Sequence, residues 1–153
     1  MKIIFIILIT TLLYANELQI KAKSFESDQS KGISTFLGDV NILKGGDELN
    51  ASKVIIYTDE DNKPIKFVAE GNVSFIIETQ KGEKYSGVSQ KAIYKPLSKE
   101  YYFYDNVHIT QLGEKNKIIG DEVIIKTIEG KAKAKSKTDK PVIMIFDLKE
   151  DDK

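Results

Sequence analysis

Gly71-Asn72-Val73-Ser74-Phe75 recurs with small changes at two other places, as Gly38-Asp39-Val40-Asn41-Ile42 and Asp105-Asn106-Val107-His108-Ile109. The three valines lie 33 and 34 positions apart. In each copy two turn-forming residues precede apolar residues that alternate with polar ones, and a period of two is typical of a β-strand. A repeat of this size predicts stacked supersecondary units, none of which buries its apolar face alone.

A second apolar burst follows each copy: Val54-Ile55-Ile56-Tyr57, Ala92-Ile93-Tyr94 and Val123-Ile124-Ile125, preceded by the small residues Ala51, Gly87 and Gly120. Branched and aromatic residues dominate these bursts, as strands prefer. Turns are predicted at Gly45-Gly46-Asp47, Asp59 to Pro64, Gly82 and Glu129-Gly130. After residue 15 no stretch sustains a helical stripe. The sequence therefore predicts an all-β fold of stacked antiparallel strands in about three imperfect repeats of ~33 residues. Such a sheet closes its apolar face upon itself as a roll, a flattened barrel or a V-shaped trough.

Composition excludes several classes of protein. The 153 residues include 23 basic ones, all lysine, and 23 acidic ones, so no basic excess favours a nucleic-acid partner. There is no cysteine, which excludes disulfides, thiolate metal sites and cysteine nucleophiles.

The first fifteen residues predict a targeting segment. Lys2 is followed by an apolar stretch from Ile3 to Leu13 and by Ala15, the pattern of a signal peptide that is cleaved on secretion to the periplasm. An uncleaved anchor is the alternative, although residues 3–15 reach roughly 20 Å as a helix against a hydrocarbon core of ~30 Å. The prediction divides the chain into a signal peptide at 1–15, one β domain at 16–149 and an acidic tail at 150–153.

No constellation of catalytic or metal-binding residues is apparent. His108, the only histidine, alternates with Val107 and Ile109 and is expected to point outward. Asp59 to Asn62 lacks the order of a calcium loop and predicts a hairpin turn. No serine has a histidine partner for a triad, and no phosphate-binding glycine loop is present. We therefore expect no enzyme activity, no cofactor and no metal.

Two other segments have both a structural and a functional interpretation. Lys131 to Lys137 alternates lysine with small residues, as a charge-guarded edge strand does, although these lysines would also suit the phosphates of a lipid headgroup. Tyr101 to Tyr104 would place Phe103 inward and Tyr102 and Tyr104 on the outer face, or offer rings to sugars at a groove rim.

The two ends of the β domain are candidate oligomer edges, because strand addition needs few specific side chains. The candidates are Leu18 and Ile20 at one end and Val142, Ile143, Ile145 and Phe146 at the other. A heterologous contact between such ends builds an open filament. A monomer whose last strand joins its own sheet is the alternative.

The repeated Gly-Asp/Asn-Val-x-Ile/Phe pattern, followed by Ala-x-x-Val-x-x-Tyr at Ala51 to Tyr57, resembles the OstA-like domain of the LptA family, over about residues 18–148. This domain occurs in periplasmic lipopolysaccharide transport protein A, in its membrane-anchored partner LptC and at the amino terminus of LptD. Asp105 stands where that pattern has glycine. The resemblance implies a β-jellyroll that carries the acyl chains of lipopolysaccharide (lipid A) in an interior groove. It also implies head-to-tail assembly with itself, an ATP-driven inner-membrane extractor complex, an LptC-like protein and an outer-membrane LptD-like protein as partners.

With that resemblance, the alternating apolar residues become candidate lipid-binding residues of the groove. They are Val40, Ile42, Val54, Ile56, Phe67, Val73, Phe75, Ile77, Val107, Ile109, Val123 and Ile125. From the pattern alone they would fill a closed core, as in a structural β-repeat scaffold. An LptC-like anchored protein is the other alternative to a carrier that bridges the inner and outer membranes.

Overall fold

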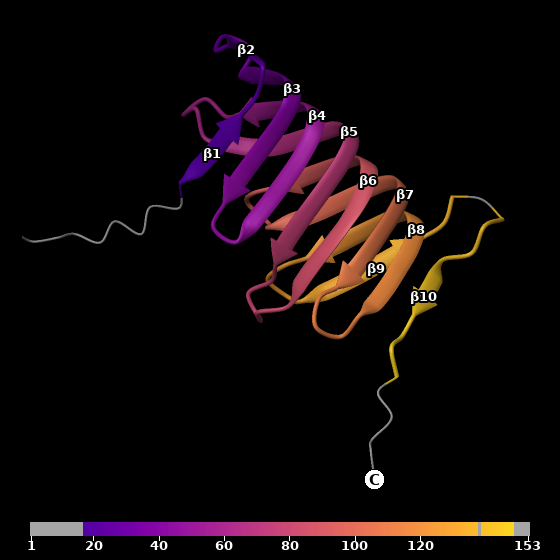
Figure 1. The fold of residues 1–153 in the computed structure, drawn as a ribbon. Helices are drawn as coiled ribbons and strands as arrows, with labels where there is room; N and C mark the ends of the chain where they lie inside the picture. The colour runs from indigo at the N-terminus through magenta and orange to yellow at the C-terminus, as the bar shows by residue number, and fades with distance from the viewer. Residues whose placement is uncertain (1–16, 138, 149–153) are drawn as a thin grey trace, which may run out of the picture.

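A computed structural model describes residues 17–137 and 139–148. The described chain forms ten β-strands in one antiparallel sheet (Figure 1). The strands are β1 (Leu18–Lys21), β2 (Ser24–Asp28), β3 (Ile33–Lys44), β4 (Asp47–Thr58), β5 (Pro64–Glu78), β6 (Lys84–Lys95), β7 (Glu100–Gln111), β8 (Asn116–Lys126), β9 (Lys131–Lys135) and β10 (Ile143–Ile145). The all-β prediction is confirmed. The predicted signal peptide and acidic tail lie outside the described residues.

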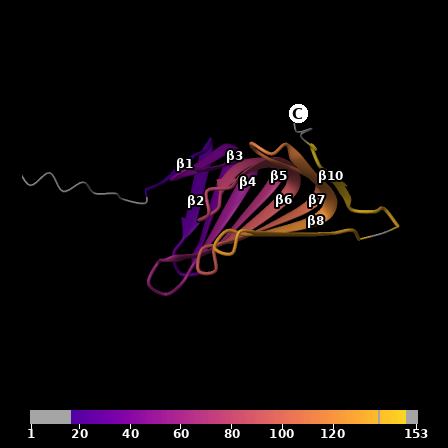
Figure 2. The ribbon, with the colours of Figure 1, turned by 90° about the horizontal axis from the view of Figure 1, so that it is seen from below.

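The sheet folds over on itself into two layers, because the six long strands β3 to β8 all bend near their middle (Figures 1 and 2). We call layer A the part in which β2 pairs with residues 33–37 of β3 and β9 pairs with residues 122–126 of β8. We call layer B the part in which β1 pairs with residues 41–44 of β3 and β10 pairs with residues 117–119 of β8. The layers are continuous along the bends and face each other across the apolar interior. This is the V-shaped trough, one of the three forms that the sequence left open (Figure 2).

The bends coincide with the repeated residue pairs of the sequence pattern. Gly38-Asp39, Gly71-Asn72 and Asp105-Asn106 all have positive φ, and the strand register shifts at each pair. Asparagine and aspartate tolerate this left-handed conformation better than other residues with a side chain. Asp105 adopts it at φ 65°, so the third repeat bends without the usual glycine. The sequence pattern indicates a turn at each pair, whereas in the structure each pair forms a bulge inside one continuous strand.

The predicted turns separate the strands where expected. Gly45-Gly46 connects β3 to β4, and Asp59 to Lys63 connects β4 to β5. In the second turn the Asp59 carboxylate accepts the backbone N–H groups of Asp61 and Lys63, both at 2.9 Å. Asp59 therefore caps this segment, which forms the predicted hairpin turn between β4 and β5.

The core occupies the space between the layers. All twelve residues predicted to point inward are buried. Sequence alternation missed several further core residues, namely Ala51, Ala69, Tyr85, Ala92, Tyr101 and Ile118. Phe103 is inward with an exposed fraction of 0%, while Tyr102 and Tyr104 lie half-buried on the outer face, as predicted. His108 is exposed, also as predicted.

Candidate functional site: the slot between the layers

The space between layers A and B, which we call the slot, is apolar along its length. It is lined on one side by residues such as Val54 and Phe103 of layer A and on the other by Val73 and Phe75 of layer B. The slot is closed on one side by the bends. On the opposite side the turns of the two layers meet, and we call this side the mouth.

The middle of the slot is filled by aromatic rings from both layers. Phe75 of layer B stacks on Phe103 of layer A with ring centroids 3.8 Å apart. Tyr101 continues the row at 5.9 Å from Phe103, and Tyr94 stacks on Tyr101 at 4.4 Å. The family resemblance implies a groove that holds acyl chains, whereas the residue pattern alone predicts a closed core. In this structure the middle of the slot is packed by its own side chains, because rings from opposite layers meet at van der Waals distance.

Space remains at the two ends of the slot. A hollow of about 40 Å³ lies toward the β1 end. Most of its lining is apolar, including Leu18, Ile42, Leu49, Phe67 and Ala92, and the charged residues Lys44, Asp47 and Glu48 also line it. This volume holds only a few water molecules. At the other end a hollow of about 180 Å³ lies between β8, β9 and the residues Met144 and Phe146. An acyl chain in the slot would therefore have to displace the aromatic row between the two hollows.

Among the described residues, three polar contacts join the layers. The Tyr101 hydroxyl of layer A donates to the Asp47 carboxylate of layer B at 2.8 Å. Burial, followed by the negative charge of Asp47, raises the pKa of Tyr101 well above its usual value. Lys44 Nζ reaches the Tyr94 hydroxyl at 3.5 Å. At the mouth the N–H of Gln80 donates to the carbonyl of Thr127 at 3.0 Å.

Comparison with known proteins decides the family. The profile of a family described as "LptA/(LptD N-terminal domain) LPS transport protein" matches residues 19–131. The chain belongs to this family. LptA-type proteins are transport proteins, and the predicted resemblance is confirmed.

A solved structure has the same LptA-type fold. It is LptH of Pseudomonas aeruginosa, described as the LptA-homologous periplasmic component of the lipopolysaccharide transport device. The TM-score is 0.76 at 16% sequence identity, with 87% of this chain and 96% of that chain covered. The comparison with curated proteins finds no match.

The edge residues predicted for this LptA-family chain are at the ends of layer B. Leu18 and Ile20 lie on β1, and Ile143 and Ile145 lie on β10, whereas Val142 and Phe146 flank β10. β10, the last strand of the described residues, pairs with β8 of its own sheet, as in the monomer alternative. Sequence reasoning did not identify β2 as the edge of layer A. It did anticipate an edge strand in Lys131 to Lys137, where β9 lies.

Within the described residues, no group of three or more His, Cys, Asp or Glu is placed to hold a metal ion. The same part of the chain contains no helix with the length and apolar character that a membrane crossing requires.

Proposed function

We propose that this chain is a periplasmic carrier that shields the acyl chains of lipopolysaccharide on their way from the inner to the outer membrane. The observation that carries this proposal is the slot, an uninterrupted apolar interior between two layers, in a chain of the LptA family. Exposing one acyl chain of about a dozen methylenes to water costs on the order of 10 kcal/mol, at ~0.8 kcal/mol per CH₂. An apolar slot removes that cost at each step.

Loading requires the two layers to part at the mouth. The polar contacts between the layers are few, and the bends can act as the hinge because each strand is already interrupted there by a bulge. When the layers part, acyl methylenes replace the ring contacts of the aromatic row. Apolar surface is then exchanged for apolar surface, so the net cost of loading stays small compared with the cost of a chain in water.

End-to-end joining of several copies would extend the slot into a bridge. Each end of the sheet exposes apolar side chains, with Leu18 and Phe25 at one end and Ile143, Phe146 and Leu148 at the other. Hollows lie at both ends of the slot, so stacking the β1 end of one copy on the β10 end of the next would make the slots continuous. In this arrangement the inner-membrane extractor complex and an LptC-like protein supply lipid, and an LptD-like protein receives it.

Export to the periplasm would depend on residues 1–15 acting as a cleaved signal peptide. An LptC-like protein would keep those residues as an anchor, and N-terminal sequencing of the protein purified from cells distinguishes the two. A closed-core scaffold is the alternative of a different class, and the packed aromatic row is the observation that favours it.

Site-specific photo-crosslinking in cells distinguishes carrier from scaffold. A photoreactive residue at Val54 or Phe75 points into the slot, and one at the neighbouring Ile55 or Ile76 points outward from the same strands. We expect lipopolysaccharide adducts at the two inward positions and not at the two outward ones. Adducts at neither inward position would support the scaffold.

A further inference from the structure

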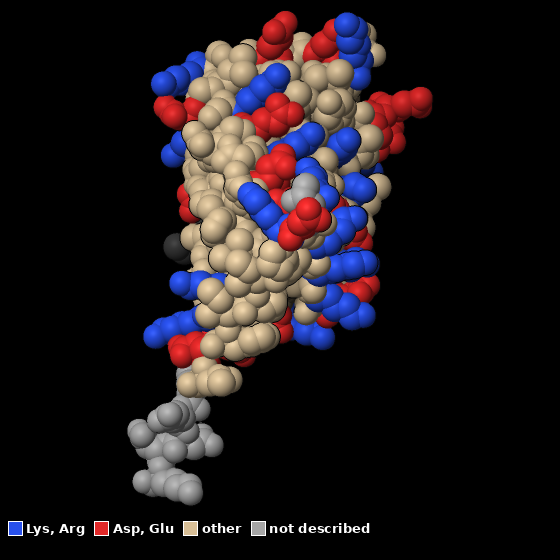
Figure 3. All heavy atoms as spheres, turned by 90° about the vertical axis from the view of Figure 1, so that its right-hand side faces the viewer, with Lys and Arg blue, Asp and Glu red and all other residues tan. Residues whose placement is uncertain are grey.

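The outer face of layer A carries more lysine than that of layer B, most of all near its C-terminal edge. Figure 3, which faces the β9–β10 end, shows lysine side chains crowded along one side of the molecule. Lys131 and Lys133 are exposed on β9, and Lys126 lies beside them on β8. Lys126 alternates with the fully buried Ile125, so it points away from the slot.

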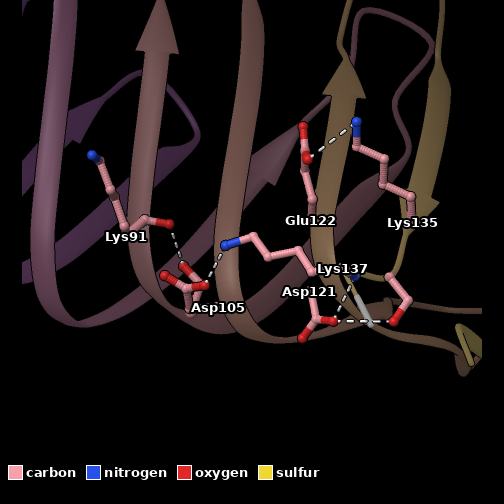
Figure 4. A network of polar contacts seen from close by, with 8 residues as sticks. Lys91, Asp105, Asp121, Glu122, Lys135 and Lys137 are labelled. Carbon is pink, nitrogen blue, oxygen red and sulfur yellow. Dashed lines mark hydrogen bonds and ion pairs between the residues drawn. The ribbon is translucent and has the colours of Figure 1, made fainter. Parts of the chain in front are cut away.

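Part of this positive charge is already balanced inside the fold. At the bend, Lys135 pairs with Glu122 at 3.4 Å, and Lys137 pairs with Asp105 at 2.9 Å (Figure 4). Asp121 accepts the N–H of Lys137 at 2.9 Å in the same network. The lysine charges at the bend end of β9 are therefore balanced by neighbouring carboxylates.

The lysine charges at the mouth end of β9 are not balanced in the same way. Lys126 and Lys131 lie directly opposite each other, a like-charge pair that destabilises a sheet. Lys131 is 3.3 Å from Glu129, but neither Lys126 nor Lys133 forms an ion pair within the described part of the chain. Glu100, which is opposite Lys126 on β7, instead accepts the hydroxyl of Tyr102.

These lysines surround a hollow on the outer surface. Its volume is about 390 Å³, and its lining consists of Tyr102, Ile124, Lys126, Glu129, Lys131, Ala132 and Lys133. Lys95 lies over the ring of Tyr102, 4.6 Å from its centroid. The ammonium stems start roughly 5 Å apart across the strands and about 7 Å apart along them. This combination offers point charges to phosphate and an aromatic edge with an apolar floor to a sugar ring.

The hollow lies beside the mouth. The turn between β8 and β9 contains Thr127, whose carbonyl contacts Gln80 across the mouth, and also Glu129, which lines the hollow. A lipid with its acyl chains in the slot would project its headgroup from the mouth next to this turn. Its headgroup would need only to fold over the turn to reach Lys126 and Lys131.

We infer that this outer hollow is a binding site for a phosphate-bearing sugar. Placing that sugar on the cargo rests on the proposed carrier function, but the chemistry of the hollow does not. Anchoring the headgroup outside the slot holds the lipid in one register while its acyl chains stay between the layers. The excess charge of Lys126 and Lys133 is then neutralised by the ligand.

The test uses a soluble phosphorylated glucosamine disaccharide without acyl chains, titrated calorimetrically into protein purified after export of the full chain. K126Q/K131Q/K133Q removes three charges from the hollow. The matched control K21Q/K84Q/K117Q removes three charges from exposed lysines of layer B. Circular dichroism of both variants checks that each is folded. We expect the first variant to weaken binding at least tenfold and the control less than twofold.

The same titration with inorganic phosphate and with the dephosphorylated disaccharide identifies the ligand chemistry. Both should bind at least tenfold more weakly than the phosphorylated sugar. Equal weakening by the two triple variants, or equal affinity for inorganic phosphate, would overturn the assignment. Because the probe has no acyl chain, its binding is independent of the crosslinking at Phe75, so failure of one proposal is distinguishable from failure of the other.

Discussion

Tyr101→Phe removes the hydroxyl that connects the two layers through Asp47, and it tests whether this contact holds the slot closed. A hydrogen bond to a charged group contributes about 1.5 to 3 kcal/mol. Asp47 is only half-buried and also accepts the N–H of Glu78 at 2.9 Å, so its carboxylate is partly rehydrated when the hydroxyl is lost. We therefore expect a loss of about 1 to 2 kcal/mol of unfolding free energy.

Urea denaturation measures this loss. With a slope of about 2 kcal/mol/M, the midpoint should fall by roughly 0.5 to 1 M. A double-mutant cycle with Asp47→Ala isolates the contact, and the double variant should be less destabilised than the sum of the single variants by about 1 kcal/mol. Opening the mouth breaks this bond, so a fluorescent fatty acid should enter Tyr101→Phe up to about tenfold faster, since 1.4 kcal/mol corresponds to a factor of ten.

Tyr102→Phe is the matched control. Its hydroxyl also donates to a carboxylate, that of Glu100, but on the outer face and within one strand. This variant should lose less than about 0.5 kcal/mol and take up the probe at the original rate. Additive effects of Tyr101→Phe and Asp47→Ala, or equal uptake by the two tyrosine variants, would show that the contact does not restrain the layers.

Three further predictions concern packing, pH and assembly. Gly87→Ala should cost about 2 kcal/mol or more of unfolding free energy in urea denaturation, because the added Cβ would lie 2.3 Å from a backbone oxygen and 2.8 Å from the ring of Phe75. Gly120→Ala should cost little, because the nearest atom would lie 3.4 Å from its added Cβ. Equal losses in the two variants would contradict the close packing at Gly87. Burial, then the hydrogen bond to Glu83, raises the pKa of Tyr85 to about 12. The unfolded chain therefore loses this proton at a lower pH than the folded chain, so the unfolding free energy should fall between pH 10 and pH 12. The fall should be less steep in Tyr85→Phe, and an unchanged slope would refute the shift. Deleting residues 142–148, which include β10, should abolish concentration-dependent oligomers in sedimentation experiments while β circular dichroism persists; unchanged oligomers would exclude joining through that segment.

Local alternation predicted twelve of the residues that point inward, although not the whole core. Val40, Val73 and Val107 each precede apolar residues at every second position, and a strand with one buried face requires that pattern. The same rule applied to Phe103 would have placed Tyr101 inward two residues earlier. That residue was missed because its polar hydroxyl needs a partner, and Asp47 lies 54 positions away in the sequence.

The bends and the filling of the slot required the structure. Gly71-Asn72 has the composition of a reverse turn and of a bulge alike, and only the register against the neighbouring strand distinguishes them. The stacking of Phe75 on Phe103 depends on how closely the two layers approach, which no local pattern encodes. Val68 points outward yet is buried, because Ile55 and Ile93 flank it on the adjacent strands.

Opening of the mouth is the step on which the proposed carrier function depends, and a disulfide across it provides the most direct test. The backbone hydrogen bond between Gln80 and Thr127 brings the two layers together, and the chain has no cysteine of its own. Q80C/T127C should therefore lock the mouth shut when oxidised. S27C/S34C, which joins paired residues of β2 and β3 within layer A, is the control disulfide.

The measurement is lipopolysaccharide crosslinking from a photoreactive residue at Phe75 in both disulfide variants, before and after reduction. We expect the oxidised Q80C/T127C protein to form no adduct and the reduced protein to regain it, while S27C/S34C crosslinks in both states. Undiminished adducts in the oxidised Q80C/T127C protein would contradict loading through the mouth.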